Sequence, residues 1–210
     1  NGQKPPAQTG ILRNPGLESL NSDGTVLDWD VWPGDPAEGV RQFAVVDRTV
    51  HTGSRALRIQ PVSTNAHAVY QYCTDRAKFN FAASYQASVW VKLENVKVSS
   101  LTLGVKRRSS DGMEYNLYTA IAQGSTDGWV KVTLDVPGLI GATLTQFDVI
   151  VDIGTGTGNV YLDDFSLVPA NIPKVQAQKP SDSILRNPGL ETLNADGSVF
   201  SGDELDLLTG

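Results

Sequence analysis

The chain has 210 residues, of which 40% are hydrophobic and 19% are charged, and its formal net charge is −6. This composition is ordinary for a globular protein. The negative charge disfavours nucleic acids and anionic membranes as partners, because their phosphate groups would be repelled. No run of 18 apolar residues occurs, so the sequence predicts no membrane-spanning helix.

The first ten residues, NGQKPPAQTG, show no hydrophobic periodicity and predict a linker over 1–10. Residues 11–168 predict one module, because short β-rich runs alternate there with turn sequences such as HTGS, SSDG and STDG. The expected strands are 43–48, 56–62, 66–73, 84–93, 100–109, 116–123, 129–137, 145–153 and 159–168. Strands at this spacing without helical segments between them predict an all-β fold, an antiparallel β-sandwich or jelly roll.

Alternation of apolar and polar residues assigns side chains to the two faces of each strand. The inner faces are expected to carry Tyr85, Ala87, Val89, Val91, Leu101, Leu103, Val105, Phe147, Val149, Val151 and Ile153. The outer faces are expected to carry Gln86, Ser88, Trp90, Lys92, Thr102, Gly104, Lys106, Asp148, Ile150 and Asp152. One sheet should therefore present a polar outer face that includes a tryptophan.

The sequence after residue 168 contains a repeat. Residues 169–183 are rich in proline, glutamine, lysine and serine, and they predict a second linker. ILRNPGLETLNADGSV at 184–199 matches ILRNPGLESLNSDGTV at 11–26 at 13 of 16 positions. Because the spacing has the size of a domain, we interpret 184–210 as the truncated start of a second copy of the module. This tail is expected either to be disordered or to pair with an edge strand of its own or a neighbouring module.

Motifs for catalysis are absent from the sequence. Neither His51 nor His67 lies near a GxSxG motif, and no HExxH motif occurs. GTGTGN at 154–159 connects two expected strands, so it predicts a hairpin loop and not a phosphate-binding loop. Cys73 is the single cysteine, which excludes an intramolecular disulfide and a cysteine-based zinc site. We therefore expect no enzymatic activity in this chain.

Six segments occur in order along the module: NPGLE (14–18), LDWD (27–30), HTGSRALRI (51–59), SYQASVWVK (84–92), GWVKVTLDV (128–136) and VYLDDFSLV (160–168). Together they resemble carbohydrate-binding modules of the family 4, 9, 16 and 22 type, with family 16 as the first hypothesis. The resemblance covers nearly the whole of 11–168. It implies a jelly roll of the galactose-binding-like kind, a structural calcium ion, and binding of polysaccharide without cleavage.

The resemblance also implies which residues would hold the calcium ion. In this chain they are Glu18, the carbonyl of Gly16, Thr52, the carbonyl of Arg55, and Asp163. Alternation along 160–168 independently places Asp163 on the inner face with Tyr161 and Phe165, and a buried carboxylate requires a cation. Calcium prefers such oxygen ligands. The alternative is an ion pair between Asp163 and Arg55 or Arg58, without metal.

Sugar binding requires exposed aromatic rings for stacking and polar side chains for hydrogen bonds. The aromatic candidates are Trp32, Tyr70, Tyr72, Trp90, Tyr115 and Tyr118, and the polar candidates are Gln71, Gln86, Lys106, Arg108, Asp148 and Asp152. Not all of them can touch one ligand, because Gln71 points away from the face that Tyr70 and Tyr72 share. Trp29 and Trp129 stand at framework positions of the resemblance and are interpreted as core residues.

These observations predict a non-catalytic module, secreted or at the cell surface, that binds a β-linked polysaccharide such as glucomannan or a cellulose-like chain. Such modules hold an attached glycoside hydrolase or polysaccharide lyase close to its substrate. The alternative is a structural or adhesive spacer of a cell-surface protein. The outer face distinguishes the two, because a binding module needs two or more exposed aromatic side chains there, whereas a spacer would present threonine, lysine and glutamate.

Overall fold

The structure is a computed structural model, and it describes residues 11–32, 42–73 and 79–177. The chain divides into two units, 1–177 and 178–210, and all described residues lie in the first unit. The predicted repeat at 184–210 and the linker at 1–10 lie outside the described residues, as does the later part of the linker at 169–183. No helix among the described residues is long and apolar enough to cross a membrane.

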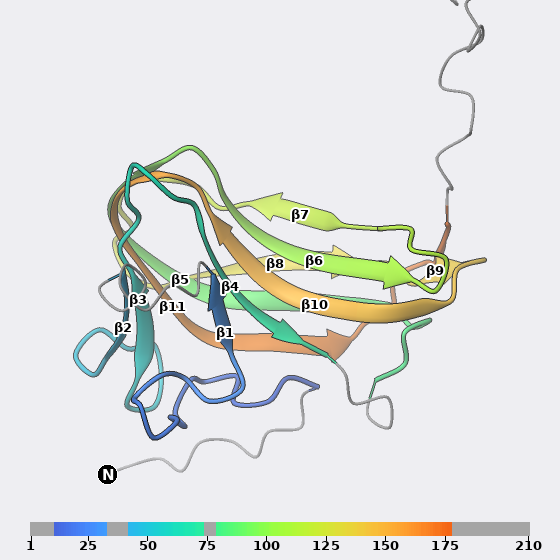
Figure 1. The fold of residues 1–210 in the computed structure, drawn as a ribbon, viewed down its shortest axis with the longest axis horizontal. Helices are drawn as coiled ribbons and strands as arrows, with labels where there is room; N and C mark the ends of the chain where they lie inside the picture. Colours follow the sequence, from blue (N-terminus) through green and yellow to red (C-terminus); the bar gives the residue numbers. More distant parts are fainter. Residues whose placement is uncertain (1–10, 33–41, 74–78, 178–210) are drawn as a thin grey trace, which may run out of the picture. The chain divides into compact units, whose positions relative to one another are not determined.

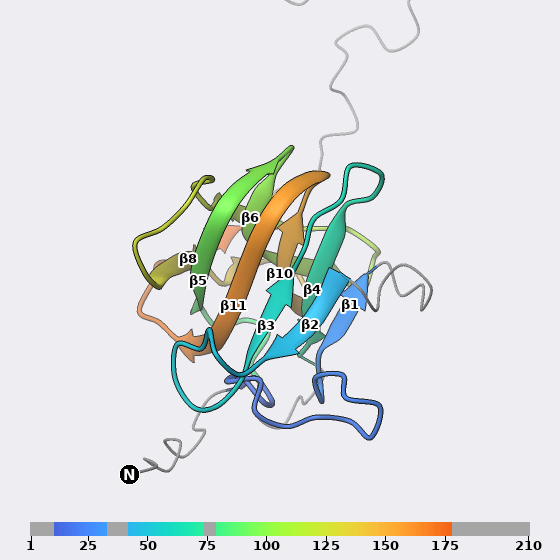
Figure 2. The same cartoon turned by 90° about the vertical axis from the view of Figure 1, so that its left-hand side faces the viewer.

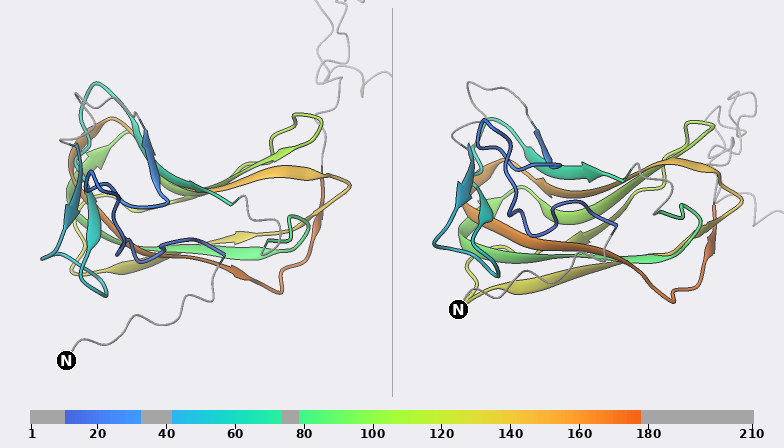
Figure 3. Two further views of the ribbon diagram at one scale, coloured as in Figure 1. Left: turned by 60° about the horizontal axis from the view of Figure 1, so that its bottom comes forward. Right: turned by 90° about the horizontal axis from the view of Figure 1, so that it is seen from below.

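Two antiparallel sheets of five strands form a sandwich, which confirms the predicted all-β fold (Figures 1 and 3). The first sheet has the order β1 (Asp30–Trp32), β4 (His67–Tyr72), β10 (Leu144–Ile153), β6 (Leu101–Ser109) and β7 (Leu117–Ala120). The second sheet has the order β2 (Phe43–Val46), β3 (Ala56–Ile59), β11 (Gly156–Pro169), β5 (Tyr85–Val98) and β8 (Val130–Val136).

The hydrophobic core lies between the two sheets and follows the predicted alternation. All the residues expected on the inner faces of β5, β6 and β10 are buried in one cluster. Because alternate residues of a strand point to opposite faces, this burial leaves the intervening residues on the outer surfaces of the sandwich. The sequence therefore predicted the side-chain directions of these three long strands correctly.

The expected inner face of β11 is wrong at Tyr161 and Asp163. Asp163 is paired with Trp90, and Tyr161 shares its side of the strand, so both lie on the outer face of the second sheet. The register then shifts after Asp163, where Asp164 adopts a φ of 43°, and Phe165 returns to the core. This β-bulge adds one residue, which simple alternation cannot anticipate.

The segment before β1 is fixed against the sandwich by Asn14 and Trp29. The side-chain amide of Asn14 donates to the carbonyls of Ser19 and Leu27. The Trp29 indole donates to the Asn14 carbonyl and lies 4.2 Å from the Phe165 ring, measured between ring centroids. Trp29 is buried, as expected of a core residue.

Part of the segment predicted as the second linker contacts the sandwich. β11 continues to Pro169, and Ser84 Oγ donates a hydrogen bond to the carbonyl of Ile172. β12 (Val175–Gln176) then pairs in parallel with β9 (Leu139–Ile140). The described part of this segment, 169–177, is therefore held by backbone and side-chain hydrogen bonds.

Candidate functional site

The outer face of the first sheet brings together candidate residues from all five strands. Directly paired residues of an antiparallel sheet share a face, so the strand register defines rows of neighbours across it. The middle row is Asp30, Tyr70, Ile150, Gly104 and Tyr118. On one side of it lies the row Trp32, Ala68, Asp152, Thr102 and Ala120. On the other side lie Tyr72, Asp148 and Lys106, followed by Gln146, Arg108 and Glu114.

Four aromatic side chains lie on this face, which we call the open face. Trp32 is 55% exposed, Tyr118 46% and Tyr72 42%, whereas Tyr70 is half-buried. Tyr70 and Tyr72 meet edge to face, with ring centroids 5.2 Å apart and planes at 83°. The exposed rings offer apolar surface that a flat apolar ligand can cover.

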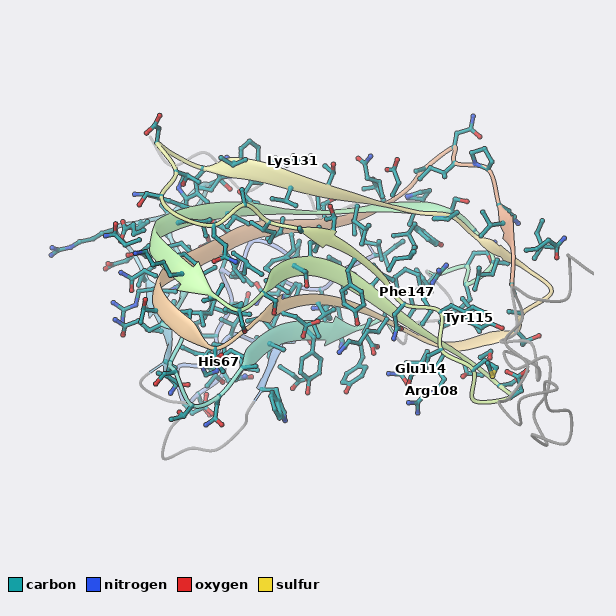
Figure 4. The ribbon with its side chains drawn as sticks, turned by 90° about the horizontal axis from the view of Figure 1, so that it is seen from above. His67, Arg108, Glu114, Tyr115, Lys131 and Phe147 are labelled. Carbon is teal, nitrogen blue, oxygen red and sulfur yellow. The ribbon has the colours of Figure 1, made fainter. Side chains whose placement is uncertain are left out.

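Charged groups lie among these rings. Arg108 Nη2 donates to Glu114 Oε1 at 2.6 Å, and both side chains are exposed (Figure 4). Lys106 Nζ lies 4.0 Å from Asp152 Oδ2. Burial raises the pKa of Asp152 despite this lysine. Asp30, Asp148, Asp152 and Glu114 face only Lys106 and Arg108 as cations, so carboxylates outnumber cations among the described residues of the open face.

Asp148 is the most enclosed polar group of the open face, because its side chain is only 5% exposed. Its Oδ2 accepts a hydrogen bond of 2.6 Å from Gln146 Nε2, while its buried Oδ1 accepts none. Burial raises the pKa of this carboxyl to about 6, against the opposing effect of the Gln146 hydrogen bond. A buried acceptor without a partner is costly.

Four of the predicted sugar-binding residues are not on the open face: Gln71, Trp90, Tyr115 and Gln86. Gln71 points into the sandwich. Its side-chain amide donates hydrogen bonds to the carbonyls of Arg13 and Asp28 and accepts one from the Arg13 N–H. Trp90 belongs to the second sheet and stacks on His51 at 3.8 Å between ring centroids. The backbone N–H of Tyr115 donates to the carbonyl of Arg107, and the Arg107 side chain is buried. The Tyr115 side chain therefore lies on the opposite side of the strand from Glu114.

Two other expectations concern the second sheet. Gln86 lies there and donates to Asp135 Oδ1, so it is not a candidate for the open face. Trp129, expected in the core, is only half-buried, and its ring lies 5.7 Å from that of His51. The His51 ring thus contacts the rings of two tryptophans on the second sheet side of the turn.

A second cluster surrounds the turn at 51–55, which two of the candidate calcium ligands, Glu18 and Asp163, contact. Glu18 Oε1 accepts hydrogen bonds from the backbone N–H groups of Ser54 and Arg55, at 2.8 and 3.1 Å. Asp163 Oδ2 accepts hydrogen bonds from the N–H groups of His51 and Thr52, at 2.8 and 3.3 Å. Segments that are far apart in the sequence therefore converge on this turn.

The candidate ligands are all oxygen atoms, which is the kind of ligand that a hard cation such as calcium prefers. Asp163 is completely buried, and burial is the main cause that raises its pKa to about 7. Within the described residues it forms no ion pair with Arg55 or Arg58, the predicted alternative partners. No cluster of three or more Asp, Glu, His or Cys side chains suited to a metal occurs in the described ranges. The expected set contains only two carboxylates, and carbonyl and hydroxyl oxygens supply the rest.

Comparison with known proteins identifies the family of this chain. The sequence profile of a family described as "Carbohydrate binding domain" matches residues 9–151. The chain belongs to this family. No match is found among the curated proteins.

Solved structures of carbohydrate-binding modules share the fold of this chain. A C-terminal family 22 carbohydrate-binding module of Clostridium thermocellum Xyn10B superposes with a TM-score of 0.54 at 16% identity, covering 76% of this chain and 96% of that module. The CBM22-1 xylan-binding domain of Paenibacillus barcinonensis Xyn10C gives 0.53 at 16% identity, covering 78% and 93%. TmCBM61, solved with β-1,4-galactotriose, gives 0.52 at 19% identity, covering 77% and 99%. At these identities the likeness shows the fold alone.

Sequence reasoning gave no role to three residues of the open face. Asp30 and Glu114 carry no expected role, although Asp30 stands two residues before the candidate Trp32 and Glu114 directly precedes the candidate Tyr115. Gly104 is expected on the outer face, but alternation alone assigns it no function. A glycine inside a strand often marks the close approach of another group, and this signal could have found it.

Proposed function

We propose that this domain binds a neutral β-linked polysaccharide, of the glucomannan or cellulose-like kind, on the open face of the first sheet. The observation that carries the proposal is the grouping of Trp32, Tyr72 and Tyr118, all exposed, with the hydrogen-bonding carboxylates Asp148 and Asp152. Aromatic rings stack on the apolar faces of sugars, and the carboxylates accept hydrogen bonds from sugar hydroxyls. A spacer module would have no use for three exposed rings on one face.

The domain is proposed to act without catalysis, as part of a secreted or cell-surface protein. Its role is then to keep an attached glycoside hydrolase or polysaccharide lyase near the polysaccharide. Tethering raises the effective concentration of the enzyme at its substrate without any new contact in the active site. The family membership of residues 9–151 supports this role.

Isothermal titration calorimetry with soluble glucomannan, barley β-glucan, xylan and galactan tests the proposal. Wild type is expected to bind at least one of them, and Trp32→Ala and Tyr118→Ala to weaken binding about tenfold or more, because each removes a stacking surface. Lys131→Ala is the control, because this exposed residue lies on the second sheet. Absence of binding by the folded wild-type protein to every glycan would contradict the proposal.

We also propose that the cluster at the 51–55 turn holds a structural calcium ion, with the carboxylates of Glu18 and Asp163, the hydroxyl of Thr52, and the carbonyls of Gly16 and Arg55 as ligands. A bound divalent cation would neutralise the buried carboxylate and join the N-terminal segment to β11. The expected result is a melting temperature that rises with calcium concentration and falls with EDTA, since a ligand that binds only the folded state stabilises it. Glu18→Gln should abolish this dependence. Equal melting temperatures in calcium and in EDTA would argue against the site.

A further inference from the structure

Gly104 occupies the centre of the open face, between Ile150 and Tyr118 in the middle row. A Cβ atom added at this glycine would lie 2.5 Å from Cδ1 and 2.6 Å from Cε1 of Tyr118. It would also lie 3.0 Å from Cγ2 of Ile150. Carbon atoms do not approach one another so closely without repulsion. The Tyr118 ring therefore occupies the space that a side chain at position 104 would fill.

The backbone does not explain this glycine. Gly104 lies in the interior of β6 and is not among the glycines with positive φ, so its conformation is open to any residue. A glycine inside a strand weakens it, because it adds backbone entropy to the unfolded chain and provides no side chain for packing. The close approach of Tyr118 is the feature that requires the glycine.

The consequence for Tyr118 is a ring that lies across the neighbouring strand instead of standing away from the sheet. One edge of the ring contacts the backbone at Gly104, and 46% of the residue remains exposed. Asp148 and Asp152 lie two residues on either side of Ile150 and point to the same face. A sugar on the exposed side of Tyr118 would therefore lie between two carboxylates, each about 7 Å along the strand from the middle row.

We propose that Gly104 is a positioning residue for ligand binding, because it allows the Tyr118 ring to lie flat across the neighbouring strand. In that orientation the ring can stack on a pyranose ring that has an unobstructed C–H face. This inference rests on the proposed function of the open face. Any side chain at position 104 would raise the ring, tilt its exposed surface and separate it from the carboxylates. A purely structural role, in which the ring only covers a weak point of the sheet, would instead affect stability alone.

The experiment compares wild type with Gly104→Ala, Gly104→Val, Tyr118→Ala and the double variant Gly104→Ala/Tyr118→Ala, on the glycan that wild type binds. Gly128→Ala is the matched control, since a Cβ atom there meets nothing within 4 Å. Gly104→Ala is expected to raise Kd about tenfold, and the larger valine to raise it further. In the Tyr118→Ala background the alanine at 104 should have no further effect on Kd, because the two residues act as one unit.

A second measurement needs no sugar. One Hα proton of Gly104 takes the direction of the missing Cβ atom and so points toward the Tyr118 ring. Its NMR signal should be shifted by the ring current in wild type and return to an ordinary value in Tyr118→Ala. Gly104→Ala should likewise change the chemical shifts of the Tyr118 ring protons, because the added methyl group displaces the ring.

Three results would overturn the proposal. The first is that Gly104→Ala lowers the melting temperature but leaves Kd unchanged while Tyr118→Ala loses binding, which contradicts this inference and leaves the proposed function intact. The second is that Gly104→Ala weakens binding equally in the presence and absence of the Tyr118 ring. The third is that folded wild type binds no glycan, which contradicts the inference together with the proposed function.

Discussion

His67 is buried in the core with no hydrogen-bond partner in the structure for either of its ring nitrogens. Its ring meets that of Phe43 edge to face at 5.6 Å between centroids, and burial lowers the pKa of the imidazole. Below the ordinary pKa of about 6.5, an unfolded histidine binds a proton that the folded protein excludes. Stability should therefore decrease as the pH falls below this value.

His67→Leu is expected to remove this dependence, because leucine fills the site without a polar group. The variant should gain stability over wild type at pH 5, and the gain should be smaller at pH 8. Urea unfolding at both pH values measures the difference. An identical gain at the two pH values would show that the histidine does not titrate in this range.

Asp148 has the opposite linkage, because its pKa is raised to about 6 in the folded protein. The folded state then holds its proton more tightly than the unfolded state, whose carboxyl has a pKa near 3.8. The stability that this group contributes at pH 3 should be lost as the pH rises through about 6, by at most about 3 kcal/mol. Asp148→Asn should remove this slope, as measured by thermal unfolding from pH 3.5 to 7.5. A slope equal to that of wild type would contradict the assignment.

At the scale of elements, the turn at 51–55 depends on Gly53. This glycine has a φ of 68°, and a Cβ atom there would lie 2.1 Å from Glu18 Oε1. Gly53→Ala should therefore cost more than the backbone strain of about 1–2 kcal/mol, because it also displaces the Glu18 carboxylate from the turn.

Gly24→Ala separates the two causes. Gly24 has a φ of 85°, but a Cβ atom there meets nothing within 4 Å. Gly24→Ala should therefore be destabilised by the backbone strain alone. Urea unfolding of both variants measures the difference between them, with the calcium concentration held constant. Equal losses of stability would show that the Glu18 contact does not hold the turn.

The sequence predicts the strands and their buried residues far better than it predicts which strands pair with one another. Alternation along β5, β6 and β10 determines which residues are buried, because that pattern is a local property of each strand. It does not determine which sheet a strand joins, so Trp90 could not be separated from the open face in advance. It also fails at Tyr161 and Asp163, because the bulge at Asp164 shifts the alternation by one residue between Leu162 and Phe165. The role of Gly104 can be inferred only when Tyr118 is known to lie beside it in the sheet.

At the scale of the whole molecule, the net charge of −6 and the excess of carboxylates on the open face act in the same direction. Both should repel polysaccharides that contain uronic acids. Binding to a neutral glycan is expected to change little between 20 and 500 mM salt, whereas any binding of polygalacturonate should appear only at high salt, where charges are screened. Tighter binding of polygalacturonate at low salt would contradict this view of the open face.

Among the described residues β11 is the last long strand, yet it lies between β3 and β5 in the interior of the second sheet (Figure 2). The first sheet is likewise built from strands that are distant in the sequence, with β4 next to β10. Folding must therefore close large loops before most of the sheet contacts form, and such topologies fold slowly, in milliseconds to seconds. During synthesis the N-terminal strands must wait for β11 to leave the ribosome, since the core that supports the open face is incomplete without it. A chaperone or a nearby folded domain that protects these unpaired edges should consequently raise the yield of active protein.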